Sequence, residues 1–155
     1  MPHVFLYAPQ DFHNLCLLTR TLEVFGQRQC YVFDSARLIR ERYGRYRTRE
    51  LRAVSAGAFE KIEWLRIEDP TPFFAEHEAR VVATVASATA RPLTEHRFVG
   101  NEVLLFGSES QGLPADVVAS VGASVTIPQR GETQSLNLAV ALGIVLFEWQ
   151  RQVGP

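Results

Sequence analysis

The sequence predicts an α/β protein in which a mostly parallel sheet carries helices on both faces. Short apolar runs alternate along the chain with longer amphipathic segments, and several of the short runs are apolar on both faces. Strands of that kind are typical of parallel sheets, because the connecting helices cover each side. Apolar residues make up 46% of the 155 residues, which is enough to bury a core. We therefore expect residues 1–155 to form a single domain.

The expected elements follow from the period of the apolar residues. Strands are expected at 3–8, 29–34, 79–85, 102–107 and 123–127, and at 62–67, where alternation favours a strand nearer an edge. Helices are expected at roughly 13–25, part of 35–59, 72–78, 113–121 and about 135–151. No repeat, low-complexity tract or linker interrupts this order.

The last expected helix raises two local questions. Ser135 is a good N-cap candidate for it, since a serine hydroxyl accepts the free N–H groups of a first turn. Gly143 lies inside the helix, where glycine costs about 1 kcal/mol relative to alanine. That cost predicts a compensation, namely close packing against another backbone in this chain or in a second subunit.

Composition excludes several classes of protein. No apolar run approaches the ~20 residues that cross a bilayer, so no membrane association is expected, and the N-terminus lacks a signal-peptide pattern. The four histidines are scattered, and Cys16 and Cys30 have no metal-like spacing to them. We expect no metal site, two reduced thiols and a cytoplasmic location.

A basic segment stands out from a net charge of −1. Residues 34–52 hold seven arginines against three carboxylates, a net charge of +4 over 19 residues, with two tyrosines among them. Arginine pairs with phosphate and stacks on bases, so an anionic partner, RNA above all, is one interpretation. The other is a solvated helical face. The RNA-binding candidates within the segment are Arg42, Arg45 and Arg47.

Three polar loops follow expected strands, at the sheet edge where ligands of parallel sheets bind. They are APQDFHNLC after 3–8, GSESQGLP (107–114) and IPQRGETQSLN (127–137). In the second loop Glu109 lies between two glycines, an arrangement that neither a hairpin nor a helix start requires. In the third, Ser135 and Asn137 either bind a polar ligand at the helix start or simply cap it.

Read together, these loops resemble a known family. The pairing of GSESQGL (107–113) with Ile127-Pro128 and Ser135-Leu136-Asn137 closely resembles the second and third motifs of the SPOUT (SpoU/TrmH-like) RNA 2′-O-ribose methyltransferases. The first motif of that family is an asparagine followed six residues later by an arginine, and Asn14 and Arg20 match it. The segment 51–64 resembles the family's alanine- and glycine-rich stretch. Cys16 departs from the pattern, because the family has glycine there.

The resemblance implies a fold, a reaction and a set of residues. It implies a deep trefoil knot near the C-terminus, a homodimer, S-adenosylmethionine as cofactor, and methyl transfer to a ribose 2′-hydroxyl of RNA. The small size favours tRNA, at the anticodon loop, over rRNA. By motif position the cofactor residues are Thr84, Gly107, Ile127, Ser135 and Leu136, and the catalytic residues are Asn14, Arg20, Glu109, Ser135 and Asn137.

Several roles stay open on the sequence alone. A guanidinium is a poor base at neutral pH, so we expect Arg20 to grip the target phosphate and stabilise the developing alkoxide. Glu109 either acts in catalysis or braces the loop by accepting backbone N–H groups. His13 is interpreted as incidental. The competing functions are a binding module inactivated by Cys16 and a phosphate-binding nucleotidase, which the lack of a P-loop ending disfavours.

Overall fold

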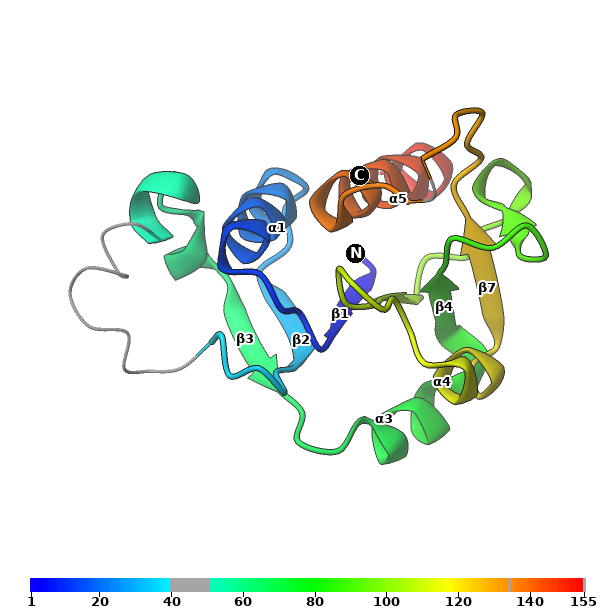
Figure 1. Ribbon diagram of the computed structural model, residues 1–155, viewed down its shortest axis with the longest axis horizontal. Helices are drawn as coiled ribbons and strands as arrows, with labels where there is room; N and C mark the ends of the chain where they lie inside the picture. Colours follow the sequence, from blue (N-terminus) through cyan, green and yellow to red (C-terminus); the bar gives the residue numbers. More distant parts are fainter. Residues whose placement is uncertain (40–50, 134, 155) are drawn as a thin grey trace.

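The protein is built around one seven-stranded sheet (Figure 1). The computed structural model describes residues 1–39, 51–133 and 135–154. The strand order is β3-β2-β1-β6-β4-β7-β5, and every pairing is parallel. The strands are β1 (His3–Tyr7), β2 (Gln29–Phe33), β3 (Glu63–Arg66), β4 (Val81–Thr84), β5 (Arg91–Pro92), β6 (Val103–Phe106) and β7 (Ala123–Thr126). The predicted α/β class with a parallel sheet is confirmed.

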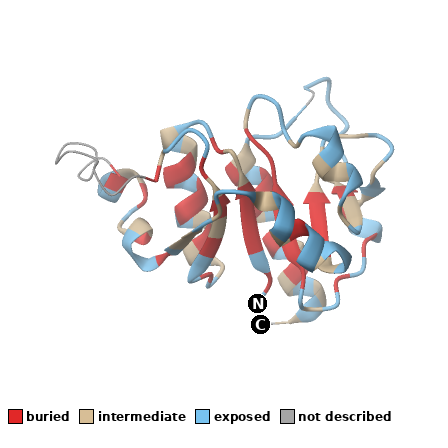
Figure 2. Cartoon of the chain, turned by 90° about the horizontal axis from the view of Figure 1, so that it is seen from below, coloured by how far each residue is buried: buried red, intermediate tan, exposed pale blue. Residues whose placement is uncertain are grey.

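Helices cover the sheet on both sides. In Figure 1, α1 (Phe12–Val24) and α5 (Leu138–Val153) lie above it, while α3 (Pro70–His77) and α4 (Ala115–Ala119) lie below. The strands between these layers are the most buried part of the molecule, as Figure 2 shows. All four residues of β6 are buried, which explains why the run is apolar on both faces.

Alternate residues of each strand feed two separate cores. In β1, Val4 and Leu6 join the core under α1 and α5, whereas Phe5 points to the opposite face. There the Phe5 ring lies 4.9 Å from the ring of Phe74 in α3, centroid to centroid. Because the strands are anchored on both faces, their carboxyl ends form a fixed platform for the loops that follow them.

Some expected elements differ from the observed ones. Each expected strand ends one residue earlier than expected, and 62–67 is the edge strand β3, as predicted. Strand β5 was not expected, because it is only two residues long and contains a proline, both of which hide it from a pattern search.

Within 35–59, residues 51–54 are helical and Ala58–Lys61 form a 3-10 helix. The RNA-binding candidates Arg42, Arg45 and Arg47 lie outside the described residues.

The predicted cap of the last helix was wrong. α5 begins at Leu138, and its N-cap is Asn137, whose Oδ1 accepts the backbone N–H of Ala139 at 2.9 Å. Asparagine caps helices as well as serine does, so local sequence could not choose between two candidates two residues apart. Ser135 therefore lies outside the helix, in the loop before it.

The long helix α5 packs beside α1. A Cβ built on Gly143 would lie 3.6 Å from Cγ2 of Thr21 in α1, which is an ordinary van der Waals distance. Within this chain the neighbour is thus a side chain, and the close backbone contact expected at Gly143 is not found.

Replacing Gly143 with alanine is expected to raise the free energy of unfolding by about 1 kcal/mol, since alanine is the better helix former and the added methyl has room. Denaturant titration of the purified protein would measure the change. A loss of stability at protein concentrations that favour a dimer would instead show that a second subunit packs against Gly143.

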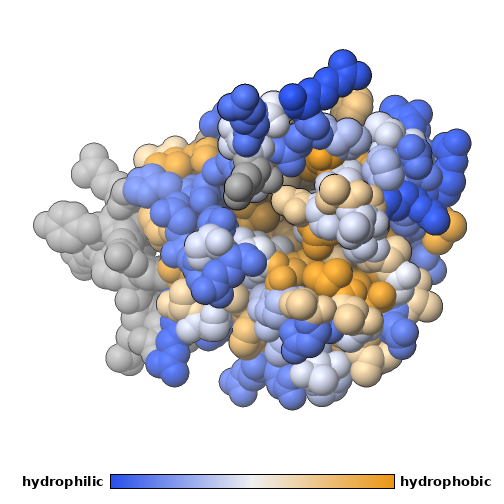
Figure 3. Space-filling model, turned by 45° about the vertical axis from the view of Figure 1, so that its right-hand side comes forward, coloured by the Kyte–Doolittle hydropathy of each residue, from blue (hydrophilic) through white to orange (hydrophobic). Residues whose placement is uncertain are grey.

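On the face shown in Figure 3, hydrophobic residues gather near the middle and hydrophilic side chains surround them. Among the helices that the structure describes, none is both long and apolar enough to cross a membrane.

Candidate functional site

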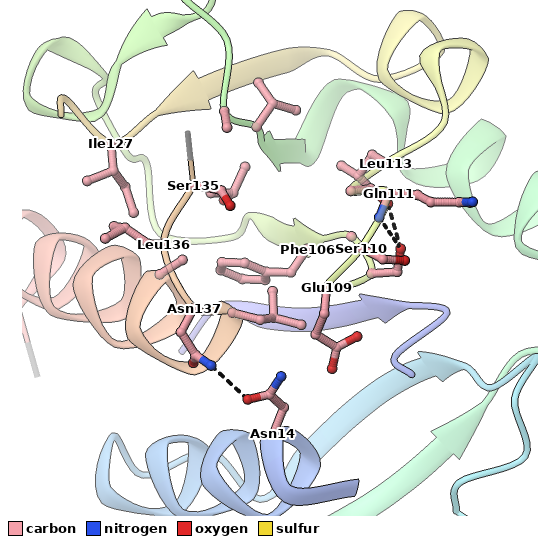
Figure 4. A pocket seen from close by; sticks show the side chains of 18 of the residues that line it. Asn14, Phe106, Glu109, Ser110, Gln111, Leu113, Ile127, Ser135, Leu136 and Asn137 are labelled. Atoms are coloured by element: carbon pink, nitrogen blue, oxygen red, sulfur yellow. Dashed lines mark hydrogen bonds between the residues drawn. The ribbon is translucent and has the colours of Figure 1, made fainter. Parts of the chain in front are cut away.

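A cavity of about 610 Å³ opens at the carboxyl ends of the central strands. The loops after β4, β6 and β7 line it, together with Asn14 at the start of α1 (Figure 4). Its volume lies within the range of small-molecule sites, about 300–1,000 Å³. Residues from all three segments singled out by the sequence therefore meet around one ligand-sized space, and the loop after β4 joins them.

The loop after β6 is folded back on itself by its two glycines. The backbone N–H of Ser108 donates to the carbonyl of Gly112 at 3.0 Å, and the reciprocal bond has the same length. A Cβ on Gly107 would lie 2.2 Å from the carbonyl carbon of Gly112, and Gly112 itself has φ +66°. Only glycine fits the first position, and it is strongly favoured at the second. The tight loop turns Glu109 toward α1 and the mouth of the cavity (Figure 4).

Glu109 holds the loop between β1 and α1. Its Oε2 accepts the backbone N–H of Gln10 at 2.8 Å, and its Oε1 accepts that of Asp11 at 3.3 Å. Asp11 in turn caps α1 by accepting the backbone N–H of Asn14 at 2.7 Å. Both carboxylate oxygens are thus engaged in positioning the start of α1, as the loop-bracing interpretation of Glu109 requires.

Two asparagines join the first loop to the third. Nδ2 of Asn137 donates to Oδ1 of Asn14 at 2.7 Å, and Figure 4 shows the two side chains pointing toward each other. Oδ1 of Asn137 caps α5 at the same time. Asn137 therefore caps its helix and also borders the cavity, while its binding of a polar ligand stays a prediction.

One residue that lines the cavity has a hydroxyl without a hydrogen-bond partner in the described part of the chain. Oγ1 of Thr84, at the end of β4, is buried and has no hydrogen-bond partner among the described residues. A buried polar group without a partner costs about 1–3 kcal/mol. A ligand that hydrogen-bonds Thr84 would remove this cost.

The charges of the cavity limit what can bind. Among the described residues that line it, Glu109 is the only charged one, and none is a lysine or arginine. A polyphosphate needs cations or an N–H cradle, so this lining does not suit a nucleotidase. In the described part of the chain, no group of three or more His, Cys, Asp or Glu residues could hold a metal ion.

Most of the predicted site residues meet at this cavity. Those that line it are Asn14, Thr84, Gly107, Glu109, Ile127, Ser135, Leu136 and Asn137. Arg20 does not line it. Arg20 is exposed on α1, six residues after Asn14, which places it about 9 Å further along the helix axis and on a different side. Within one chain, the structure does not bring Arg20 to the site.

Two residues near Asn14 in α1, Cys16 and His13, do not line the cavity. Cys16 is completely buried under α1 and is not among the lining residues, so its side chain does not crowd the approach to the site. His13 is exposed and does not line the cavity either. Cys16 in place of the motif glycine therefore packs into the core.

The structure adds residues that sequence reasoning had not assigned. Ser110 and Gln111 lie in the glycine loop and Gln129 in the loop after β7, and all three line the cavity. Gln10 contacts the same loop, because Oγ of Ser110 donates to its Oε1 at 2.6 Å. Ser110 and Gln111 could have been found from their place in the motif. Nothing in the sequence marks Gln10.

Known proteins resemble this chain over nearly its whole length. The 23S rRNA (guanosine-2′-O-)-methyltransferase of Acinetobacter baylyi is 30% identical over 146 residues, which are 92% of this chain and 56% of that protein. A structure concerned with the 2-OH methylation of C/U34 on tRNA matches with a TM-score of 0.82 and 29% identity, over 98% of this chain and 95% of that one.

A third similar protein contains the cofactor that the resemblance implies. The AdoMet-bound rRNA methyltransferase from Sinorhizobium meliloti has a TM-score of 0.77 and 30% identity, over 97% of this chain and 56% of that one. This chain thus spans about half the length of the rRNA enzymes it matches. The SpoU rRNA Methylase family matches residues 1–147, and the chain therefore belongs to that family.

Proposed function

We propose that the protein is an S-adenosylmethionine-dependent methyltransferase that modifies a ribose 2′-hydroxyl of RNA, with tRNA favoured over rRNA. The observation that carries the proposal is the cavity in which Asn14 of the first family motif meets the second and third motifs, joined to the third by the Asn14–Asn137 hydrogen bond. The preference for tRNA is supported by the structure concerned with the 2-OH methylation of C/U34 on tRNA, which matches this chain with a TM-score of 0.82.

The residues present fit the cofactor. S-adenosylmethionine supplies an electrophilic methyl group on a positively charged sulfonium. The one charged residue in the described part of the lining is a carboxylate, which suits a cationic ligand, and the Thr84 hydroxyl would offer that ligand a hydrogen bond. Gly107, Ile127, Ser135 and Leu136 would complete the contacts, as the family resemblance implies.

Thr84→Val is expected to have two opposite effects, because valine keeps the shape and removes the hydroxyl. Cofactor affinity should fall about 5- to 20-fold, while the cofactor-free protein becomes more stable by about 1 kcal/mol. Calorimetric titration and denaturant unfolding would measure the two. Thr84→Ser, which keeps the hydroxyl, is the control. Unchanged affinity in the valine variant would remove Thr84 from the cofactor site.

Each chain residue then has a role in the transfer. The bond from the 2′-oxygen to the methyl carbon forms as the bond from sulfur to carbon breaks, and the hydroxyl proton leaves to a phosphate oxygen or water. Arg20 grips the target phosphate and stabilises the developing alkoxide. Asn14, Asn137 and Ser135 border the reacting groups. Glu109, with both oxygens engaged by backbone N–H groups, is a positioning residue.

This assignment needs two chains, because Arg20 lies away from the cavity of its own chain. The outer faces of the neighbouring helices α1 and α5 carry exposed apolar residues at helical spacing: Leu17 and Val24 on α1, and Val140, Ile144 and Phe147 on α5. Such a surface on two packed helices suits a second copy of the chain, which would bring the partner's Arg20 to the cavity. A monomeric mass by light scattering at micromolar concentration would count decisively against the dimer.

The fold and location of the enzyme belong to the same proposal. The chain passes from β7 through residues 127–137, several of which line the cavity, into α5 beside α1, and this path supports the trefoil knot that the resemblance implies. Stretching the chain from both ends would test it, since a knotted chain ends shorter than about 3.6 Å per residue. Cys16 and Cys30 are buried and form no disulfide, which supports the cytoplasm, where RNA substrates are found. Cell fractionation would test that location.

The function itself is tested with radiolabelled S-adenosylmethionine and unmodified RNA separated into tRNA and rRNA. We expect label in the tRNA fraction, and label in rRNA alone would reassign the substrate. Cofactor binding without label in either fraction would favour the inactive binding module. The buried position of Cys16 argues against that alternative, because the suspected lesion lies in the core.

A further inference from the structure

The side chain of Gln10 stands beside the cavity without belonging to its wall. Gln10 is exposed in the loop between β1 and α1. Two residues that line the cavity form hydrogen bonds with it, one with its side chain and one with its backbone. Oγ of Ser110 donates to its side-chain Oε1 at 2.6 Å, and its backbone N–H donates to Oε2 of Glu109 at 2.8 Å. The backbone and the carboxamide of Gln10 are therefore fixed separately.

The bond from Ser110 sets the orientation of the carboxamide. With Oε1 accepting a hydrogen bond, the Nε2 amino group takes the other position, where it offers two N–H donors. Neither donor has a partner among the residues that the structure describes, and Gln10 is exposed. The carboxamide of Asn137 differs from that of Gln10, because both of its polar groups have partners: its oxygen caps α5 and its amino group donates to Asn14. Gln10 thus presents an oriented donor that no contact within the described residues uses.

The position of Gln10 suggests what the donor meets. A target ribose must approach the part of the cavity bordered by Asn14, and Gln10 lies four residues before Asn14 in the loop that leads to it. The base and phosphate of that nucleotide carry hydrogen-bond acceptors. A glutamine amide is a common reader of base edges, and RNA is read mostly through splayed, single-stranded bases.

We propose that Gln10 is a substrate-reading residue, whose Nε2 amino group donates a hydrogen bond to an acceptor on the target nucleotide while Ser110 fixes its orientation. This inference rests on the proposed function, since it presupposes an RNA nucleotide at the mouth of the cavity. It adds a contact that none of the three family motifs contains. The acceptor belongs either to the base or to the phosphate of that nucleotide.

The geometry allows a clean test. Glu109 binds the backbone of Gln10, so substitutions of the Gln10 side chain leave the loop anchored. Gln10→Ala removes the donor, and Gln10→Glu replaces it with a charged acceptor of the same shape. Gln29→Ala is the matched control, because Gln29 is also an exposed glutamine with a hydrogen-bonded side chain, at the start of β2 and far along the strand from the site.

Four measurements are needed on each full-length variant: S-adenosylmethionine affinity by calorimetry, binding of unmodified total tRNA, methyl transfer to that tRNA, and the identity of the methylated nucleosides by mass spectrometry. For Gln10→Ala we expect kcat/KM for RNA to fall about tenfold. For Gln10→Glu we expect about 100-fold, because two acceptors then face each other. Cofactor Kd should stay within about twofold in both, and Gln29→Ala should behave as wild type.

The outcomes separate the two proposals. A wider range of methylated nucleosides in Gln10→Ala would identify a base acceptor, and an unchanged range with lower yield would identify a phosphate. Gln10→Glu turning over as fast as wild type would overturn the substrate-reading role and leave the proposed function intact, and so would a parallel loss of cofactor affinity. A wild-type protein that neither binds nor methylates RNA would remove both.

Discussion

Replacing Arg20 with alanine is expected to abolish methyl transfer, a loss of about 100-fold or more in kcat, while S-adenosylmethionine affinity stays within a few-fold. The reason is positional. Arg20 is absent from the lining of its own chain's cavity, so its removal leaves cofactor contacts in place. Arg20→Lys should recover only part of the rate, because lysine keeps the charge but not the fork that pairs with a phosphate.

Methyl transfer to unmodified tRNA, measured with labelled cofactor, checks the rate. Arg28→Ala is the control, since Arg28 is an exposed arginine just beyond α1 whose described ion pair is with Glu23. Unchanged turnover in Arg20→Ala would remove the assigned role.

Mixing two inactive variants tests whether Arg20 acts across a dimer. Leu136→Arg should block the cofactor cavity, because Leu136 lines it and the added cation repels a sulfonium. A heterodimer of Leu136→Arg and Arg20→Ala would contain one intact site. The Arg20→Ala chain supplies its unaltered cavity, and the Leu136→Arg chain supplies Arg20. Random exchange at equal concentration should restore about a quarter of wild-type activity. No recovery, with exchange confirmed by mass spectrometry, would place Arg20 outside a shared site.

Phe147→Asp is expected to convert the proposed dimer to a monomer and to reduce methyl transfer at least tenfold. Phe147 is 61% exposed on α5, in line with Val140 and Ile144. In the proposed dimer its ring is buried, so aspartate both removes apolar contact and leaves a charge without a partner in the interface. In a monomer the same change would be nearly neutral, because the side chain already faces water.

Light scattering and the labelling assay would be run on the same samples. Val99→Asp is the matched control, since Val99 is even more exposed, at 81%, but lies in the loop before β6 and not on the outer faces of α1 and α5. We expect the control to keep both mass and activity. A Phe147→Asp protein that is monomeric yet fully active would show that the site is complete within one chain.

The sequence could predict the sheet because its strands satisfy a strong local constraint. A strand covered on both faces must be apolar throughout, as in β6, and this signal does not depend on the rest of the fold. β5 lacks it, since two residues at the sheet edge with a proline among them have no period to detect. The start of α5 was misplaced for a related reason: Ser135 and Asn137 are equally good caps, and the Asn14 bond that engages Asn137 comes from 123 residues away in the chain.

For the site, the sequence by itself determined which loops matter. The glycines around Glu109 and the Ser135–Asn137 segment stood out because unusual residues at strand ends are visible locally. Asn14 was identified through the family resemblance, and the structure brings all of them to one cavity. Only the tertiary structure decided how each residue is used. It engages both oxygens of Glu109 with the backbone of Gln10 and Asp11, buries Cys16 in the core, turns Arg20 away and orients Gln10. The contacts of Gln10 and Asp11 with Glu109 and Ser110 join segments about 100 residues apart in the chain. They depend on the order of the strands and the path of the loops, which no local pattern encodes.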